Sequence, residues 1–319
     1  EICACLVGSE MCIRDRSEIK WIISCLRKYK KEIRVFVKYR IEYEQSFLKG
    51  KYDECQNLLD KVRSEIGISL WYYESQFLVY EYADERSLSI KMMSDELERA
   101  IDKNNNYILY IFKCLFDRSS SDLAPYSYDD NLHASYKRNR NELHEDYYKY
   151  LLFRLNYFNY YKDVDLSKIC LFESLSALVD RYEILVTLVK SVVVTGKEYK
   201  SFKDDLLELY SISHDRELWP VLRYLGESID MPGFYNSSFV SILDEYYKGN
   251  YAKCIEICRD FCDAETSIFD VCVIYSRCLI HLKKDFQEPL IGKNAPLNQI
   301  AQLVFKILNS EDVADSIYN

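Results

Sequence analysis

Apolar residues recur at intervals of three and four along most of the chain, the spacing that places them on one face of an α-helix. Between Ser17 and Leu48 this pattern predicts two successive helices. Only 8 Gly and 5 Pro occur in 319 residues, so few positions interrupt the helical pattern. We therefore predict an all-α protein. Further helices are predicted over residues 52–66, 69–82, 88–102, 107–116, 139–161, 166–195, 198–210, 217–226, 234–248, 251–262, 267–282 and 297–308.

A short phrase occurs twice between predicted helices. Residues 47–55 read FLKGKYDEC and residues 246–254 read YYKGNYAKC, with the two glycines 199 residues apart (249 − 50 = 199). The glycine permits a tight turn, the tyrosine covers the corner, and the small cysteine lets the second helix approach the first closely. Each copy therefore predicts a hairpin of two antiparallel helices. The residues assigned to these turns are Gly50, Tyr52 and Cys55 in the first copy, and Gly249, Tyr251 and Cys254 in the second.

The repeated phrase resembles the central part of the tetratricopeptide repeat (TPR), a helical hairpin of about 34 residues. The first-helix tryptophan, leucine and glycine of that family are not reproduced, and Tyr39 and Tyr43 are the nearest equivalents. The resemblance implies a divergent TPR-like α-solenoid, in which antiparallel hairpins form a right-handed superhelix that binds proteins or peptides. The separation of 199 residues is close to six such units. Expected core positions are Leu59, Val62, Tyr73, Phe77, Tyr80, Cys258, Phe261, Tyr275 and Leu279.

Two segments depart from the helical pattern. Residues 117–136 contain serines, aspartates and Pro125, and predict an irregular insertion or boundary. Segment 117–136 separates the predicted N-terminal repeats (17–116) from the predicted C-terminal repeats (137–319). We expect both sets of repeats to pack as one continuous solenoid. Residues 1–16 begin without Met and resemble translated sequencing adapter. We therefore expect a non-native leader, native sequence from about Ser17 and a truncated reading frame, and the sequence leaves open whether an upstream domain was lost.

Charge and composition narrow the functional classes. The chain has 42 Lys and Arg against 51 Asp and Glu, a net charge of −9, which makes nucleic acid an unfavourable partner. The longest nearly apolar stretch, Ile184–Val194, is far short of the about 20 residues that span a bilayer. The twelve cysteines lie in helical patterns, so we expect reduced thiols in the cytoplasm. Frequent Lys, Asn, Ile and Tyr suggest a bacterial source.

The cysteines near the second copy raise the question of a metal site. Cys254, Cys258 and Cys262 share one helix face, and Cys272 and Cys278 lie on the next predicted helix. Zinc ligands usually come from tight turns with a spacing of two to four residues plus a second pair, and this segment has no such turn. We favour core packing over metal or redox chemistry, and expect no cofactor and no metal.

One segment supports an enzymatic alternative. Arg138 and His144 resemble the motif of HEPN ribonucleases, in which histidine would act as general acid or base and arginine would stabilise phosphate charge. A solvated helix start explains the same residues. In the apolar helix that follows, Asp180–Glu183 reads DRYE, and Arg181 is expected to pair with a carboxylate for structural reasons.

Tyrosine is abundant, with 29 in the chain and the highest density over residues 147–161. Tyrosines that line the concave face of a solenoid offer large contact area with a polar tip, although helix packing is the alternative. We predict a non-catalytic protein- or peptide-binding module, an adaptor or sensor region. The alternatives are a HEPN-like ribonuclease, and a peptide-responsive regulator that lacks its upstream output domain. The binding candidates are Tyr147, Tyr150, Tyr157 and Tyr161.

Overall fold

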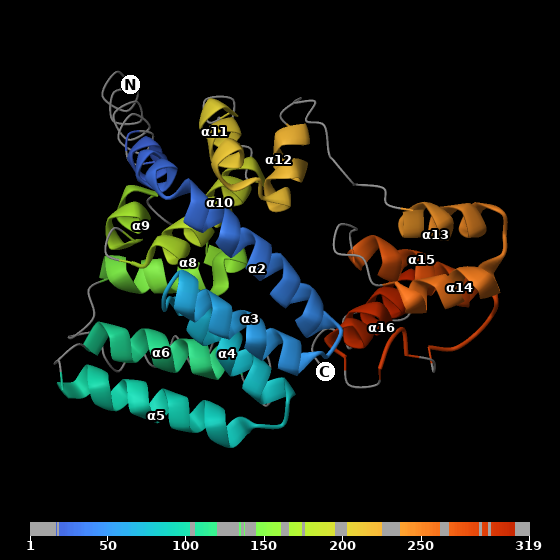
Figure 1. Cartoon of the computed structure of the whole chain (residues 1–319), viewed down its shortest axis with the longest axis horizontal. Coiled ribbons are helices and arrows are strands. Elements are labelled where there is room, and N and C mark those ends of the chain that lie inside the picture. Colours follow the sequence, from blue (N-terminus) through green and yellow to red (C-terminus); the bar gives the residue numbers. More distant parts are fainter. Residues whose placement is uncertain are drawn as a thin grey trace. The chain divides into compact units, whose positions relative to one another are not determined.

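The structure is a computed structural model in which every element of the described residues is helical (Figure 1). The chain forms two compact units. One comprises Glu1–Arg40, Leu59–Leu123 and Ser127–Ile229, and the other comprises Ile41–Leu58, Ala124–Tyr126 and Asp230–Asn319. The described residues are 17, 19–102, 106–119, 134, 137, 145–160, 166–173, 176–194, 203–224, 237–261, 268–286, 289–292 and 295–309.

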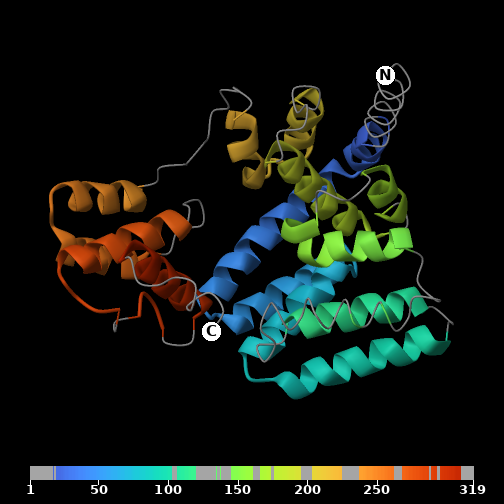
Figure 2. The ribbon, with the colours of Figure 1, turned by 180° about the vertical axis from the view of Figure 1, so that it is seen from behind.

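Two groups of helices build most of the first unit. In the first group, α4, α5 and α6 each contact the other two, and α5 and α6 lie side by side in both views (Figures 1 and 2). In the second group, α9 contacts α8 and α10, and α10 also contacts α4 and η3. The bounds are α4 Leu70–Tyr82, α5 Arg86–Asp102, α6 Asn106–Ser119, α8 Glu145–Tyr160, α9 Leu166–Glu173, α10 Leu178–Val194, α11 Lys203–Ser213, η3 Arg216–Leu218 and α12 Trp219–Tyr224.

The second unit contains four consecutive helices around one apolar core. Each of them contacts the next in sequence, and α13 also contacts α15. The last helix begins with a proline, whose missing N–H costs nothing at a helix start. The bounds are α13 Ser237–Tyr247, α14 Tyr251–Asp260, α15 Ile268–His281 and α16 Pro296–Leu308.

Within the described residues, most predicted helices agree with the structure, but the helix expected over 217–226 starts as the 3-10 helix η3 before α12, and a second difference is larger. The single helix expected over residues 166–195 is two helices, because the chain bends at Ser176 before α10 begins. The Ser176 carbonyl accepts a hydrogen bond from Arg181 Nε (3.0 Å), and the Ser176 N–H donates to the Glu173 carbonyl (3.0 Å). Arg181 thus stabilises the bend, and it forms no ion pair with any described carboxylate, although we expected one. In the predicted irregular segment 117–136, the first three residues extend α6 to Ser119, and nearly all of the rest lies outside the described residues.

The two predicted turns have the same geometry. The first joins α2 (Lys30–Leu48) to α3 (Tyr52–Glu65), and the second joins α13 to α14. Both glycines lie in the left-handed region, with φ of 72° at Gly50 and 77° at Gly249. In each turn the glycine N–H bonds to the carbonyl three residues back (2.9 and 3.0 Å), and the next N–H bonds to the carbonyl five residues back (2.8 and 2.9 Å). This pair of bonds is the Schellman motif, which satisfies the last carbonyls of a helix.

Two further helices end in the same way at non-glycine residues. Asp84 follows α4 with φ of 59°, and Lys283 follows α15 with φ of 52°. Each precedes an N–H that bonds to the carbonyl five residues back (2.8 Å for Glu85, 3.0 Å for Lys284). The left-handed residues are therefore 34 residues apart in each pair (84 − 50 and 283 − 249). The same spacing of 34 residues therefore separates left-handed residues in an early and in a late part of the described chain.

The left-handed backbone predicts opposite changes in stability for substitutions at Gly249 and at Lys283. A Cβ at Gly249 would meet no atom within 4 Å, so Gly249→Ala tests the backbone alone. We expect it to lower the free energy of unfolding by about 1–2 kcal/mol, and Gly249→Asn to cost less, because asparagine tolerates this region. Lys283→Gly should instead raise stability. Urea denaturation measures all three, and equal stability of the alanine and asparagine variants would contradict the assignment.

Candidate functional site

The two cysteines of the repeated phrase occupy equivalent, fully buried positions. Cys55 Sγ donates to the Tyr43 carbonyl at 3.7 Å, and Cys254 Sγ donates to the Ile242 carbonyl at 3.5 Å, each bond reaching twelve residues back to the preceding helix. Next to them, Tyr52 and Tyr251 cover the turns through edge-on ring contacts with the preceding helix, at centroid distances of 5.9 Å in both copies. In each hairpin the small thiol therefore lies within hydrogen-bonding distance of the backbone of the preceding helix.

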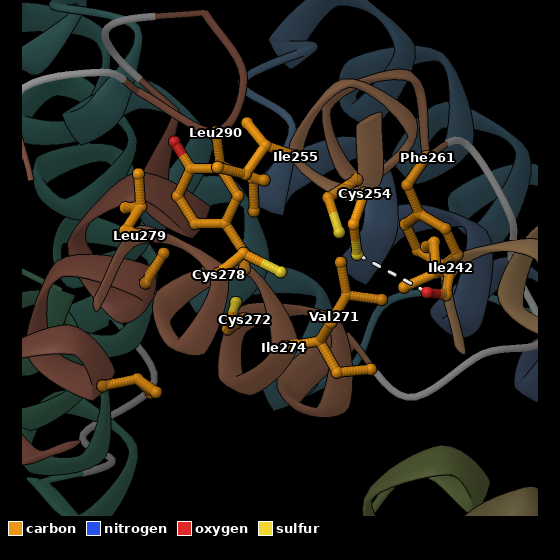
Figure 3. Close-up of a cluster of buried hydrophobic side chains, with 14 of the residues drawn as sticks. Ile242, Cys254, Ile255, Phe261, Val271, Cys272, Ile274, Cys278, Leu279 and Leu290 are labelled. Atoms are coloured by element: carbon orange, nitrogen blue, oxygen red, sulfur yellow. Dashed lines mark hydrogen bonds between the residues drawn. The ribbon is translucent and has the colours of Figure 1, made fainter. Parts of the chain in front are cut away.

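Four buried thiols belong to the core of the second unit (Figure 3). They lie on α14 and α15 among apolar side chains, and Cys262 is outside the described residues. Hydrogen bonding to Cys254 and burial both raise the pKa of Cys258 and of Cys278. Bonds accepted from these two thiols lower the pKa of Cys254, while its burial and its own bond to Ile242 favour the protonated form. No group of His, Cys, Asp and Glu suited to a metal ion occurs among the described residues. The four buried thiols of this core are Cys254, Cys258, Cys272 and Cys278.

Burial of Cys55 gives a prediction in alkaline solution. Desolvation raises the pKa of this thiol from its ordinary value near 9 to about 12. Between these values the unfolded chain loses a proton that the folded chain keeps, so stability falls as the pH rises, by up to about 1.4 kcal/mol per pH unit for this thiol. Cys55→Ala should make the alkaline loss of stability less steep in urea denaturation. Cys25→Ala, which removes a half-buried thiol elsewhere, is the control, and equal slopes in the two variants would contradict the prediction.

The structure corrects the prediction that Tyr147 and Tyr150 line a binding surface. Both are buried, and their rings pack against Phe172 at centroid distances of 5.4 and 5.2 Å. The Tyr150 hydroxyl donates to Glu173 at 2.5 Å. These two tyrosines therefore serve the interior of the first unit. The side chain of Tyr157 and the whole of Tyr161 lie outside the described residues.

Tyr150 belongs to a buried network of charged side chains. Arg154 forms ion pairs with Glu173 and, at 3.3 Å, with Asp180. Asp180 also accepts hydrogen bonds from the N–H groups of Leu70 (2.9 Å) and Trp71 (3.1 Å), the first residues of α4. A carboxylate at this position satisfies free N–H groups and complements the helix dipole. Burial raises the pKa of Asp180, whereas Arg154 and these N–H groups act in the opposite direction.

A second network surrounds Arg40, which is 1% exposed. Its guanidinium donates to Glu183 at 2.7 Å and to both carboxylate oxygens of Asp215 at 2.8 and 2.9 Å, and Glu217 lies 3.1 Å away. The buried Tyr182 hydroxyl donates to the same Asp215 at 2.6 Å. Within the segment DRYE, Asp180 thus belongs to the first network, and Tyr182 and Glu183 belong to the second. The role of this segment in the structure is to join helices.

Removal of the Arg40 charge should be far more costly than removal of an exposed one. Arg40→Leu would leave the fully buried Asp215 carboxylate without its cation, and we expect a loss of about 3–5 kcal/mol. Arg27→Leu is the matched control, because Arg27 pairs with Glu208 at the surface and should cost less than about 1 kcal/mol. Both values come from urea denaturation. Similar losses for the two variants would rule out a special contribution from Arg40.

An exposed aromatic cluster lies at the adjoining ends of three helices of the second unit. Tyr246 contacts the rings of Tyr247 (5.6 Å), Tyr251 (5.9 Å) and His281 (6.3 Å). Tyr251 and His281 are stacked at 4.4 Å and 5°. Tyr247 is 81% exposed, and Val240, two turns earlier on α13, is 43% exposed. We call Val240, Tyr246, Tyr247, Tyr251 and His281 the aromatic face. Tyr251 was predicted only as a turn residue, whereas Tyr246, Tyr247 and Tyr251 of the repeated phrase all belong to this cluster.

The remaining sequence predictions concern residues without a described structure. Arg138 and His144, the ribonuclease candidates, lie outside the described residues, and so do residues 1–16. Comparisons with protein-family models, with curated proteins and with solved structures found no match for the chain. Among the helices that the structure describes, none combines the length and apolar character that crossing a membrane requires.

Proposed function

We propose that the protein is a non-catalytic, TPR-like helical-repeat module that binds a protein or peptide. Three features support repeat character: the equivalent hydrogen bonds of the two hairpins, their equivalent tyrosine contacts, and the left-handed residues 34 residues apart. A period of about 34 residues is typical of TPR hairpins. The right-handed superhelix of that family is part of the same proposal.

The aromatic face carries the proposal of binding. Tyr247 exposes most of its ring beside two partly buried tyrosines and a stacked histidine. Tyrosine is enriched at protein interfaces and among the residues that dominate binding energy, because its ring buries much area with little loss of conformational freedom. The contacts within the cluster hold the rings in place before a partner arrives. This surface therefore replaces the region around Tyr147 and Tyr150 as the proposed binding site.

A cytoplasmic adaptor or sensor is the cellular role we propose. The described cysteines are free thiols, which supports a reducing compartment. We also propose a bacterial source, because Lys, Asn, Ile and Tyr are frequent in the chain.

Selection from a phage-displayed random peptide library tests the binding function. The immobilised protein should enrich related sequences, and synthetic versions should bind in fluorescence anisotropy. Tyr247→Ala should weaken them by about tenfold or more, because loss of a central interface tyrosine costs at least about 1.4 kcal/mol.

The control variant is Tyr29→Ala, which removes another exposed tyrosine, 48% exposed, from the first unit. It should leave the affinity unchanged. Equal affinity of the wild-type and Tyr247→Ala proteins for the selected peptides would exclude the aromatic face as the binding site.

A further inference from the structure

Basic side chains border the aromatic face at the end of α15. Arg277 and His281 are one helical turn apart, and both are exposed. Lys283 and Lys284 follow in the turn and are exposed as well. Because His281 is stacked on Tyr251 and also contacts Tyr246, this basic segment adjoins the tyrosines directly.

Acidic residues nearby leave much of this positive charge uncompensated. On α13, Asp244 lies 3.5 Å from Lys248, and Glu245 binds Lys253 at 3.1 Å. None of the ion pairs in the described part of the chain includes Arg277, Lys283 or Lys284. Asp285 is the adjacent exposed carboxylate. Among the described residues, cations that form no ion pair therefore border the aromatic face of a chain whose net charge is −9.

We infer that the aromatic face and this basic border together bind an acidic peptide segment with aromatic or aliphatic side chains between its carboxylates. The inference rests on the proposed binding function and specifies the chemistry of the partner. The apolar side chains of the peptide pack against Tyr247 and Val240, and its carboxylates face Arg277 and the two lysines. Complementary charge accelerates association and selects among partners.

Charge also distinguishes this partner from nucleic acid. A nucleic-acid surface usually carries a row of cations that follows successive phosphates. Here the three cations that form no ion pair among the described residues are grouped at one helix end, with Asp285 next to them and Asp244 on the neighbouring helix. A few carboxylates on a short peptide match this distribution better than a continuous polyanion does.

Fluorescence anisotropy with three labelled probes tests the inference. The probes are a peptide of aspartate, glutamate and leucine with a central phenylalanine, the same peptide with lysine at every acidic position, and a single-stranded oligouridine. The acidic peptide should bind at least about tenfold more tightly than the basic one, and should weaken as the salt rises from about 0.05 to about 0.5 M, because salt screens exposed charges. The double variant Arg277→Glu/Lys284→Glu should lose about tenfold or more in affinity for the acidic peptide.

A control variant of the same net charge separates a local from a global effect. Lys28→Glu/Lys91→Glu changes the charge by the same amount at exposed positions of the first unit and should retain the affinity. Circular dichroism checks that both double variants are folded. The inference is overturned if the acidic peptide binds no better than the basic one, if both double variants behave alike, or if the oligouridine binds most tightly.

The two proposals fail in different ways. If library peptides that are neutral or basic require Tyr247, the binding function stands and the acidic partner is wrong. If selected peptides bind but none depends on Tyr247, the binding function stands, and the aromatic face and the acidic-peptide inference are wrong. If no peptide is selected, both proposals are wrong.

Discussion

The first unit depends on the neutralisation of one buried guanidinium. Arg40 lies on α2, and its carboxylate partners come from α10 and from the start of η3, 143 and 175 residues later in the chain. A packing that separated them would leave a charge in the interior without a counter-ion, which costs several kcal/mol. The ion pair therefore fixes which face of α2 meets α10. Asp215 adds a further constraint, because it also accepts the Glu217 N–H at the start of η3 (3.0 Å).

The helix α10 transmits this constraint to α4. Four consecutive residues of α10 include Asp180, which caps the start of α4, and Glu183, which binds Arg40 on α2. Between them, Tyr182 reaches Asp215. Apolar contacts alone would allow these helices to slide by small amounts, since dispersion forces have little direction. The short charged contacts have a defined direction, so they favour the observed register over small shifts of it.

Local patterns predicted the helices and two of the turns, but not what the side chains contact. The burial of eight of the nine expected core positions was confirmed, and Tyr80 is half-buried. Gly50 and Gly249 were found because glycine marks a left-handed turn, whereas Asp84 and Lys283 adopt the same backbone without that mark. The bend at Ser176 contains neither glycine nor proline. The ion pairs join residues far apart in sequence, and no local spacing reveals them. Tyrosine density likewise indicated Tyr147 and Tyr150, because composition does not distinguish a buried ring from an exposed one such as Tyr247.

The thiols of the second unit have a consequence for how this unit moves. Cys254 and Cys258 on α14 and Cys272 and Cys278 on α15 are at most 1% exposed, so no reagent reaches them in the closed state. Alkylation then requires transient separation of the two helices, and its rate at constant reagent concentration reports how often that separation occurs. The half-buried Cys25 in the first unit gives an internal reference. The buried thiols thus report how often the core of the second unit opens locally, without any added label.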